Sequence, residues 1–231
     1  MTEANPLGRD HPAPRQDNQS SPGQTPCQTV GPFFHYGLPW KGGADLVGQS
    51  DLGARPDLFP EEHYVMNLAS PKGDVAGEKI EVTGAVYDAD GNPVPDAMIE
   101  IWQANAAGRY ASPDDPRIDL PLDAGFVGFG RASTSKDGVY RFLTVKPGRV
   151  PGPGNAMQAP HLAVGLFARG VLKRLVTRIY FEDEDANAED AILELVPDHR
   201  RATLIALRDG EGVYRFDIRL QGAGETVFFD L

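Results

Sequence analysis

The sequence predicts an all-β protein, a two-sheet β-sandwich with an extended N-terminal arm and long loops. Its 231 residues include 26 glycines and 20 prolines, a composition that favours many short strands joined by turns over long helices. Alternating apolar residues recur between these turn signals, as in sandwich folds. The length is sufficient for one large hydrophobic core. We therefore expect a single β-sandwich domain over residues 78–231.

The N-terminal part of the chain is expected to stay outside this domain. Residues 1–26 are rich in proline, glutamine, serine and asparagine, so they cannot bury enough apolar surface to offset their ordering entropy, and we expect a disordered tail. Residues 27–77 are expected to form an extended arm followed by loops. The aromatic residues of the arm are consistent with packing on its own core or with docking on a partner, and the residues alone do not separate these alternatives.

The strand pattern begins at residues 78–88, where apolar and polar side chains alternate. A turn signal at residues 90–93 leads into a strand ending at Trp102, which predicts a hairpin. A second hairpin is predicted from residues 126–134 and 139–145. The later elements are expected in this order: strands at 161–169 and 173–181, a short helix at 188–195, and closing strands at 203–207, 213–220 and 226–229.

Net charge and cysteine content limit the function and the compartment. The net charge of −11 and the pI near 4.8 argue against binding to nucleic acid or to anionic membranes. An anionic substrate would therefore require a local cation. Cys27 is the single cysteine, so an internal disulfide is impossible and a reducing compartment is indicated. Because residues 1–26 hold no apolar core of a signal peptide, we expect a cytoplasmic protein.

General catalytic motifs are missing from the sequence. It has no glycine-rich phosphate loop, no Cys-x-x-Cys pair and no His-Glu-x-x-His motif, and its five histidines have no metal-ligand spacing. From the residues alone the prediction therefore stops at a β-sandwich without an assigned function.

Several separated motifs, in order along the chain, resemble the alpha-type subunits of the intradiol ring-cleavage dioxygenase family. They include Lys146-Pro147-Gly148 and the run Leu166-Phe167-Ala168-Arg169-Gly170. Further matching segments lie at residues 25–33, 100–105, 159–161, 214–219 and 224–230. The resemblance implies a share in cleaving protocatechuate with dioxygen to 3-carboxy-cis,cis-muconate, a step of aromatic compound catabolism.

The resemblance also marks four ligand positions, where family members hold ferric iron with two tyrosines and two histidines. Tyr110 and His161 match the first tyrosine and the first histidine, but Val150 and Ala163 stand where the second of each is expected. Ferric iron needs hard anionic oxygen and imidazole ligands, so two of four donors are insufficient. We expect no metal ligand and no catalytic residue in this chain alone. The implied iron belongs to a beta subunit, with which the chain forms a hetero-oligomer.

The resemblance further implies that this chain lines the partner's active site. Arg169 would contact the substrate carboxylate, a role that suits a planar, permanent cation. Thr29, Gly31, Pro32 and Phe33 would line the same pocket, with Phe33 replacing the tyrosine usual in the family. Strand parity puts Arg169 on the same face as His161 but roughly 26 Å along the strand, so it cannot serve a site around His161. The alternative is a surface ion pair.

Two other functions stay open at this stage. The chain could be a self-sufficient intradiol dioxygenase with an altered iron site that acts on a related catechol, or a non-enzymatic β-sandwich binding module. Iron content of the isolated chain separates the first alternative from a subunit role. A neighbouring beta-type gene with an intact iron site would count against the second.

Overall fold

The computed structural model describes residues 29–31, 41–55, 60, 74–154 and 156–230, and the predicted tail at residues 1–26 lies outside this part. Within it the all-β prediction is confirmed, because strands dominate and the helices are short. The strands are β1 (Lys79–Tyr87), β2 (Met98–Trp102), β3 (Phe129–Ser133), β4 (Val139–Val145), β5 (Val150–Pro151), β6 (Met157–Gln158), β7 (His161–Phe167), β8 (Leu175–Phe181), β9 (Ile205–Arg208), β10 (Val213–Arg215) and β11 (Ile218–Arg219). The helices are η3 (Asp185–Glu189), α1 (Ala191–Glu194), α2 (Asp198–Arg201) and η4 (Ala202–Leu204).

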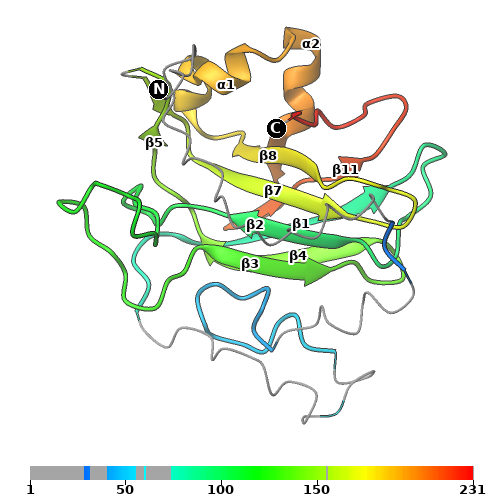
Figure 1. Ribbon diagram of the computed structural model, residues 1–231, viewed down its shortest axis with the longest axis horizontal. Helices are drawn as coiled ribbons and strands as arrows, with labels where there is room; N and C mark the ends of the chain where they lie inside the picture. Colours follow the sequence, from blue (N-terminus) through cyan, green and yellow to red (C-terminus); the bar gives the residue numbers. More distant parts are fainter. Residues whose placement is uncertain (1–28, 32–40, 56–59, 61–73, 155, 231) are drawn as a thin grey trace, which may run out of the picture.

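Nine strands form one continuous, nearly closed sheet, in the order β11-β1-β10-β9-β8-β7-β2-β3, with β4 on the other side of β1 (Figure 1). The predicted division into two sheets is not confirmed, because the parallel pair of β8 and β9 joins the two halves into one hydrogen-bonded path. The strands β3 and β4 lie at free edges of this sheet, and the two-residue β11 likewise pairs only with β1. A loop bridges β3 and β4 at one end, where the Leu46 amide donates to the Leu143 carbonyl at 2.8 Å and the Arg131 amide to the Gly43 carbonyl at 2.7 Å.

Both predicted hairpins are wrong in their pairing, although both turns form. The turn after β1 closes locally, with the Val94 amide donating to the Val86 carbonyl at 2.8 Å. β1 then pairs with β4, while β2 pairs with β3 and β7. The turn between β3 and β4 is likewise closed at Ser135, but these strands belong to opposite edges of the sheet. Alternation identifies a strand and its two faces, whereas the partner is set by long-range burial.

One hydrophobic core lies inside the curved sheet. Ile99 and Ile101 of β2 are fully buried, while Glu100 and Trp102 on the opposite face are half-buried, as the parity of this strand predicts. Residues from both halves of the sheet share this core; among them are Val82, Phe142, Leu162, Leu166 and Tyr214. Fully burying one such side chain contributes about 1.5–3 kcal/mol to folding. The core therefore fixes the outer faces of β2, β7 and β8, where the site residues lie.

The short helices lie beside β8 at one end of the sheet, close to the C-terminus (Figure 1). Asp190 caps α1 by accepting hydrogen bonds from the amides of Ile192 and Leu193 at 2.9 and 2.8 Å. The closing strand predicted at residues 226–229 is reduced to a single bridge between Val176 and Phe229. None of the helices in the described ranges is long and apolar enough to cross a membrane.

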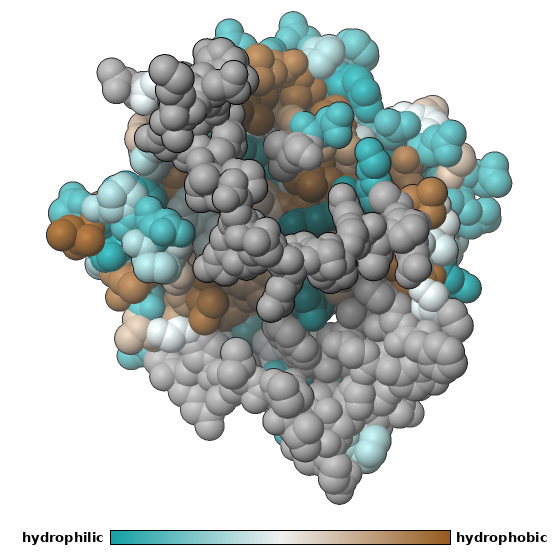
Figure 2. All heavy atoms as spheres, in the orientation of Figure 1, coloured by the Kyte–Doolittle hydropathy of each residue, from teal (hydrophilic) through white to brown (hydrophobic). Residues whose placement is uncertain are grey.

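In Figure 2 the coloured residues at the top and right of the outline are mainly hydrophilic, and hydrophobic residues appear among them as separate groups.

Candidate functional site

Tyr110 is held by a turn that Asn105 organises. The Asn105 Oδ1 atom accepts hydrogen bonds from the amides of Ala107 and Arg109 at 3.1 and 2.9 Å. The Tyr110 amide then donates to Asp115 Oδ2 at 2.8 Å. The Tyr110 ring stacks on Trp102 of β2, with ring centroids 5.9 Å apart and planes 2° from parallel. Burial raises the pKa of the Tyr110 phenol, so the ring stays neutral near pH 7.

Val150 lies next to this turn because Gly108 permits a close approach. Gly108 has φ +80°, and a Cβ atom there would come within 2.1 Å of the Arg149 carbonyl oxygen. Only glycine tolerates both the conformation and the contact. Val150 is 3% exposed and pairs with Gln158 across the short ladder of β5 and β6. The second tyrosine position of the family is therefore occupied by a buried, apolar side chain.

His161 begins β7 and is 5% exposed. Its Nδ1 atom lies 2.8 Å from the Ala159 carbonyl oxygen. A carbonyl can only accept, so Nδ1 carries the proton. Burial, with a further contribution from the charge of Arg178, lowers the pKa of His161 to about 4, so the ring is neutral at physiological pH. The ring also packs against Tyr180 at a centroid distance of 5.7 Å.

Asp190 organises the surroundings of His161 from the cap of α1. One carboxylate oxygen accepts from the Ala159 amide at 2.8 Å, and the other accepts from the Tyr180 hydroxyl at 3.0 Å. Because the Ala159 carbonyl in turn accepts from the His161 ring, the buried Asp190 carboxylate fixes the positions of both the His161 and the Tyr180 rings.

Ala163 lies directly opposite Trp102 on β2 and Arg178 on β8. Cross-strand neighbours of this kind project on the same face, with Cβ atoms about 4.5–5.5 Å apart. Arg178 Nη1 donates to Gln158 Oε1 at 2.5 Å and lies 3.3 Å from the Tyr180 hydroxyl. The structure thus brings the four ligand positions together around a guanidinium that the sequence reasoning missed. The sequence signal for Arg178 was a lone arginine in the apolar run of β8. Its location beside Ala163 could be known only from the register between β7 and β8.

The side chains at the four ligand positions do not fit ferric iron. Valine and alanine offer no donor, the buried phenol and imidazole are neutral, and a permanent cation projects among them. In the described part of the chain, no three histidine, cysteine, aspartate or glutamate side chains gather closely enough to hold a metal ion. No chemical step through iron is assigned to this chain.

Arg169 lies at a separate corner, in the turn after β7. The strand expected to reach residue 169 ends at Phe167, because the chain turns at Gly170 with φ +81°. The Arg169 guanidinium contacts Asp96 Oδ2 at 2.8 Å, and the two side chains are 60% and 33% exposed. The Gly170 amide donates to Thr29 Oγ1 at 2.6 Å, which brings the arm to the same corner.

We call Thr29, Asp96, Arg169 and Gly170 the Arg169 corner. Asp96 has φ 67°, a left-handed conformation that aspartate and asparagine adopt more readily than most residues. Sequence reasoning placed Thr29 and Arg169 in one site but missed Asp96. Gly31 is exposed close by, and Pro32 and Phe33 lie outside the described residues.

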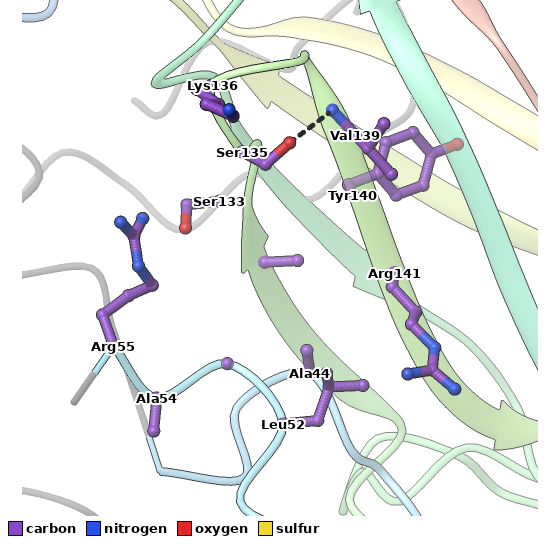
Figure 3. Close-up of a pocket in the computed structure, with 12 residues that line it drawn as sticks. Ala44, Leu52, Ala54, Arg55, Ser133, Ser135, Lys136, Val139, Tyr140 and Arg141 are labelled. Atoms are coloured by element: carbon purple, nitrogen blue, oxygen red, sulfur yellow. Dashed lines mark hydrogen bonds between the residues drawn. The ribbon is translucent and has the colours of Figure 1, made fainter. Parts of the chain in front are cut away.

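A pocket of about 490 Å³ opens elsewhere, between the free edges β3 and β4 (Figure 3). Its lining combines small apolar side chains such as Ala44 and Leu52 with Ser133, Ser135 and Lys136. Ser135 Oγ accepts a hydrogen bond from the Val139 amide at 3.2 Å (Figure 3). The lining includes neither the four ligand positions nor the Arg169 corner, so this pocket is a feature of the sheet edge and separate from both.

A protein-family model described as Dioxygenase matches residues 59–222. This match covers more than half of the chain, and the chain belongs to the intradiol dioxygenase family.

Within that family, the chain is 46% identical to the protocatechuate 3,4-dioxygenase alpha chain of Burkholderia cepacia, covering 90% of this chain and 98% of the relative. It is 42% identical to the alpha chain of Pseudomonas putida, covering 90% and 96%. Identity to the beta chain of Burkholderia cepacia is 40%, covering 79% of each chain.

Solved structures are similar in fold. The dioxygenase domain of a carbohydrate-binding fusion protein from Streptomyces sp. SirexAA-E is 26% identical, with a TM-score of 0.50 over 66% of this chain and 85% of that one. The 3-chlorocatechol 1,2-dioxygenase of Rhodococcus opacus 1CP is 22% identical, with a TM-score of 0.51 over 65% and 63%. The second likeness concerns the fold alone.

Proposed function

We propose that this chain is the alpha-type subunit of a protocatechuate 3,4-dioxygenase and that a beta-type partner holds the ferric iron. The observation that carries the proposal is the near full-length identity of 46% and 42% to two alpha chains. The loss of donors at Val150 and Ala163 supports the assignment of iron to the partner. The comparisons give no support to a self-sufficient enzyme or to a non-enzymatic binding module.

The proposed reaction cleaves protocatechuate with dioxygen between its two hydroxyl-bearing carbons and yields 3-carboxy-cis,cis-muconate. In this proposal the chain provides a pocket wall next to the partner's iron, built from Arg169, Thr29, Gly31, Pro32 and Phe33. The Arg169 corner supports this role, because the arginine is exposed and the arm reaches its neighbour Gly170. A guanidinium has five N–H donors, so pairing with Asp96 leaves donors for a substrate carboxylate.

We also propose that the curved sheet acts as the two facing layers of the family's sandwich. One half would comprise β1, β4, β10 and β11, and the other β2, β3, β7 and β8. The shared core supports this arrangement, because Val82 and Phe142 of the first half are buried in the same cluster as Ile99 and Leu166 of the second. A sandwich domain over residues 78–231 and a cytoplasmic location are parts of the same proposal.

Co-expression with the beta-type chain from the same source tests the assignment. We expect the two chains to co-purify, iron to be stoichiometric with the beta-type chain, and cleavage of protocatechuate to require both. An isolated chain that carries about one iron per chain and cleaves a catechol would instead establish a self-sufficient enzyme. A chain that neither assembles nor supports cleavage would favour a binding module.

A further inference from the structure

We propose that the Arg178 guanidinium has taken the place of the metal ion among the four ligand positions, and that it excludes a metal even where the missing donors are restored. The proposal goes beyond the subunit role, because it concerns side chains of this chain only and holds whichever partner the chain has.

The first argument is position. Arg178 lies opposite Ala163 on the strand register, and two residue pairs further along, Tyr180 lies opposite His161. The side chains of both pairs project on one face of the sheet, together with Trp102, against which Tyr110 stacks. Val150 joins the group through Gln158, which pairs with it and accepts from Arg178. Ala163 therefore lies directly opposite Arg178, His161 and Val150 are each linked to it through one residue, and Tyr110 is linked to it through Trp102 and Ala163.

The second argument is the nature of its partners. Arg178 contacts a neutral amide oxygen at 2.5 Å and a neutral phenol oxygen at 3.3 Å. Other cations on the sheet behave differently: Arg131 pairs with Glu100 at 2.5 Å, and Lys146 with Glu184 at 2.8 Å. The ion pairs of the described residues do not include Arg178. Arg109 also donates to a neutral oxygen, the Leu120 carbonyl, but Arg178 is held by two neutral side-chain oxygens beside the ligand positions, as a coordinated cation would be.

The third argument is the reach of its charge. Arg178 Nη1 lies 3.3 Å from the Tyr180 hydroxyl, and the Tyr180 ring packs against His161 at a centroid distance of 5.7 Å. The guanidinium charge therefore lies close to the surviving imidazole. Since arginine cannot be neutralised in a protein, a metal cation entering the same site would face an unremovable like charge.

Restoring the donors tests the proposal. The full chain would be prepared as V150Y/A163H, as V150Y/A163H/R178Q and as V150Y/A163H/R178K, and exposed to ferric iron under identical conditions. Glutamine removes the charge and keeps a polar side chain, and lysine keeps the charge. Bound iron per chain and the visible absorption of tyrosinate bound to ferric iron are measured after gel filtration, and folding is checked by circular dichroism.

We expect less than about 0.1 iron per chain in the V150Y/A163H variant and in the lysine control, and at least roughly fivefold more, with visible colour, when R178Q is added. Near-stoichiometric, coloured iron with Arg178 retained would overturn the proposal. A folded R178Q variant that binds no more iron than V150Y/A163H would overturn it too.

If V150Y disturbs the buried site, a second pair of variants without that substitution tests whether Arg178 excludes a metal. Cu²⁺ is titrated into A163H and into A163H/R178Q, which test His161 and the added imidazole alone, and binding is followed by electron paramagnetic resonance. We expect the R178Q variant to bind at least about tenfold more tightly, because a like charge has been removed. Equal affinities would show that Arg178 does not exclude the metal.

Discussion

Two arginines, Arg169 in the turn after β7 and Arg178 within β8, differ in their exposure and in the charge of the groups they contact. Arg169 is exposed and pairs with the carboxylate of Asp96, whereas Arg178 is half-buried and contacts only the neutral oxygens of Gln158 and Tyr180 among the described residues. An exposed ion pair contributes about 0–1 kcal/mol, so Arg169 can exchange its partner at little cost. Arg178 has less freedom, because leaving its partners would remove the donor of the half-buried Gln158 Oε1. One residue type thus suits an intermolecular contact at one position and an internal structural role at the other.

The largest effect is expected at Arg169. In the assembled enzyme, Arg169→Ala should lower kcat/KM for protocatechuate by an amount worth about 2–5 kcal/mol, because it removes one side of a charge-assisted contact that the partner subunit shields. Catechol lacks the carboxylate and should be affected far less. The measurement is kcat/KM for both substrates in wild type and variant.

Iron content and assembly of Arg169→Ala serve as controls and should match wild type. Equal losses for both substrates would make Arg169 structural, and no loss for either would make it a plain surface residue.

The sequence was sufficient to single out candidate residues, but it did not show which of them lie side by side in the fold. The strand ending at Trp102 was correctly predicted, and Ile99 and Ile101 share its buried face, because a period of two is a local property. The location of Arg178 beside Ala163 depends on the register between β7 and β8, which local pattern does not specify. For the same reason the predicted pairing of β1 with β2 was wrong. The four ligand positions therefore remain a prediction from motifs, while the cation among them required the folded structure.

A second effect concerns pH. The pKa of His161 is lowered to about 4 in the folded chain, against an ordinary value of 6.5. Between these values the unfolded chain binds the extra proton, so the free energy of unfolding should fall as the pH falls from about 6.5 toward 4, by at most about 3 kcal/mol. Arg178 and Asp190 are the charged groups that act on the ring. Urea unfolding at several pH values checks this.

His161→Asn is the matched control for that pH dependence, since an amide can still donate to the Ala159 carbonyl but does not titrate. Its unfolding free energy should be flatter over the same window. A slope unchanged from wild type would assign the effect to other groups. In Arg178→Gln the dependence should also weaken, because one cause of the low pKa has been removed.

An intermediate effect is expected from truncating Arg178. Arg178→Ala leaves Gln158 without its donor and opens space beside Ala163, so it should cost about 1–3 kcal/mol of unfolding free energy. Arg178→Gln should cost less, since the longer side chain fills part of that space and keeps a polar donor there. Denaturant titration at pH 7 compares the two variants. If both leave the midpoint unchanged, Arg178 is an ordinary solvated cation and its contrast with Arg169 is lost.

The smallest effect should come from Asp96, the partner of Arg169. Asp96→Asn keeps a residue that tolerates φ 67° and removes only the charge, so unfolding free energy should change by less than about 1 kcal/mol. Asp96→Ala removes the same charge and adds backbone strain, so the difference between the two variants isolates the conformational cost. If Arg169 exchanges Asp96 for the substrate carboxylate, the asparagine variant should keep kcat/KM for protocatechuate within roughly fivefold of wild type, because only a weak, exposed pair has been lost. A loss as large as that of Arg169→Ala would instead show that the ion pair positions the guanidinium and is not exchanged in the complex.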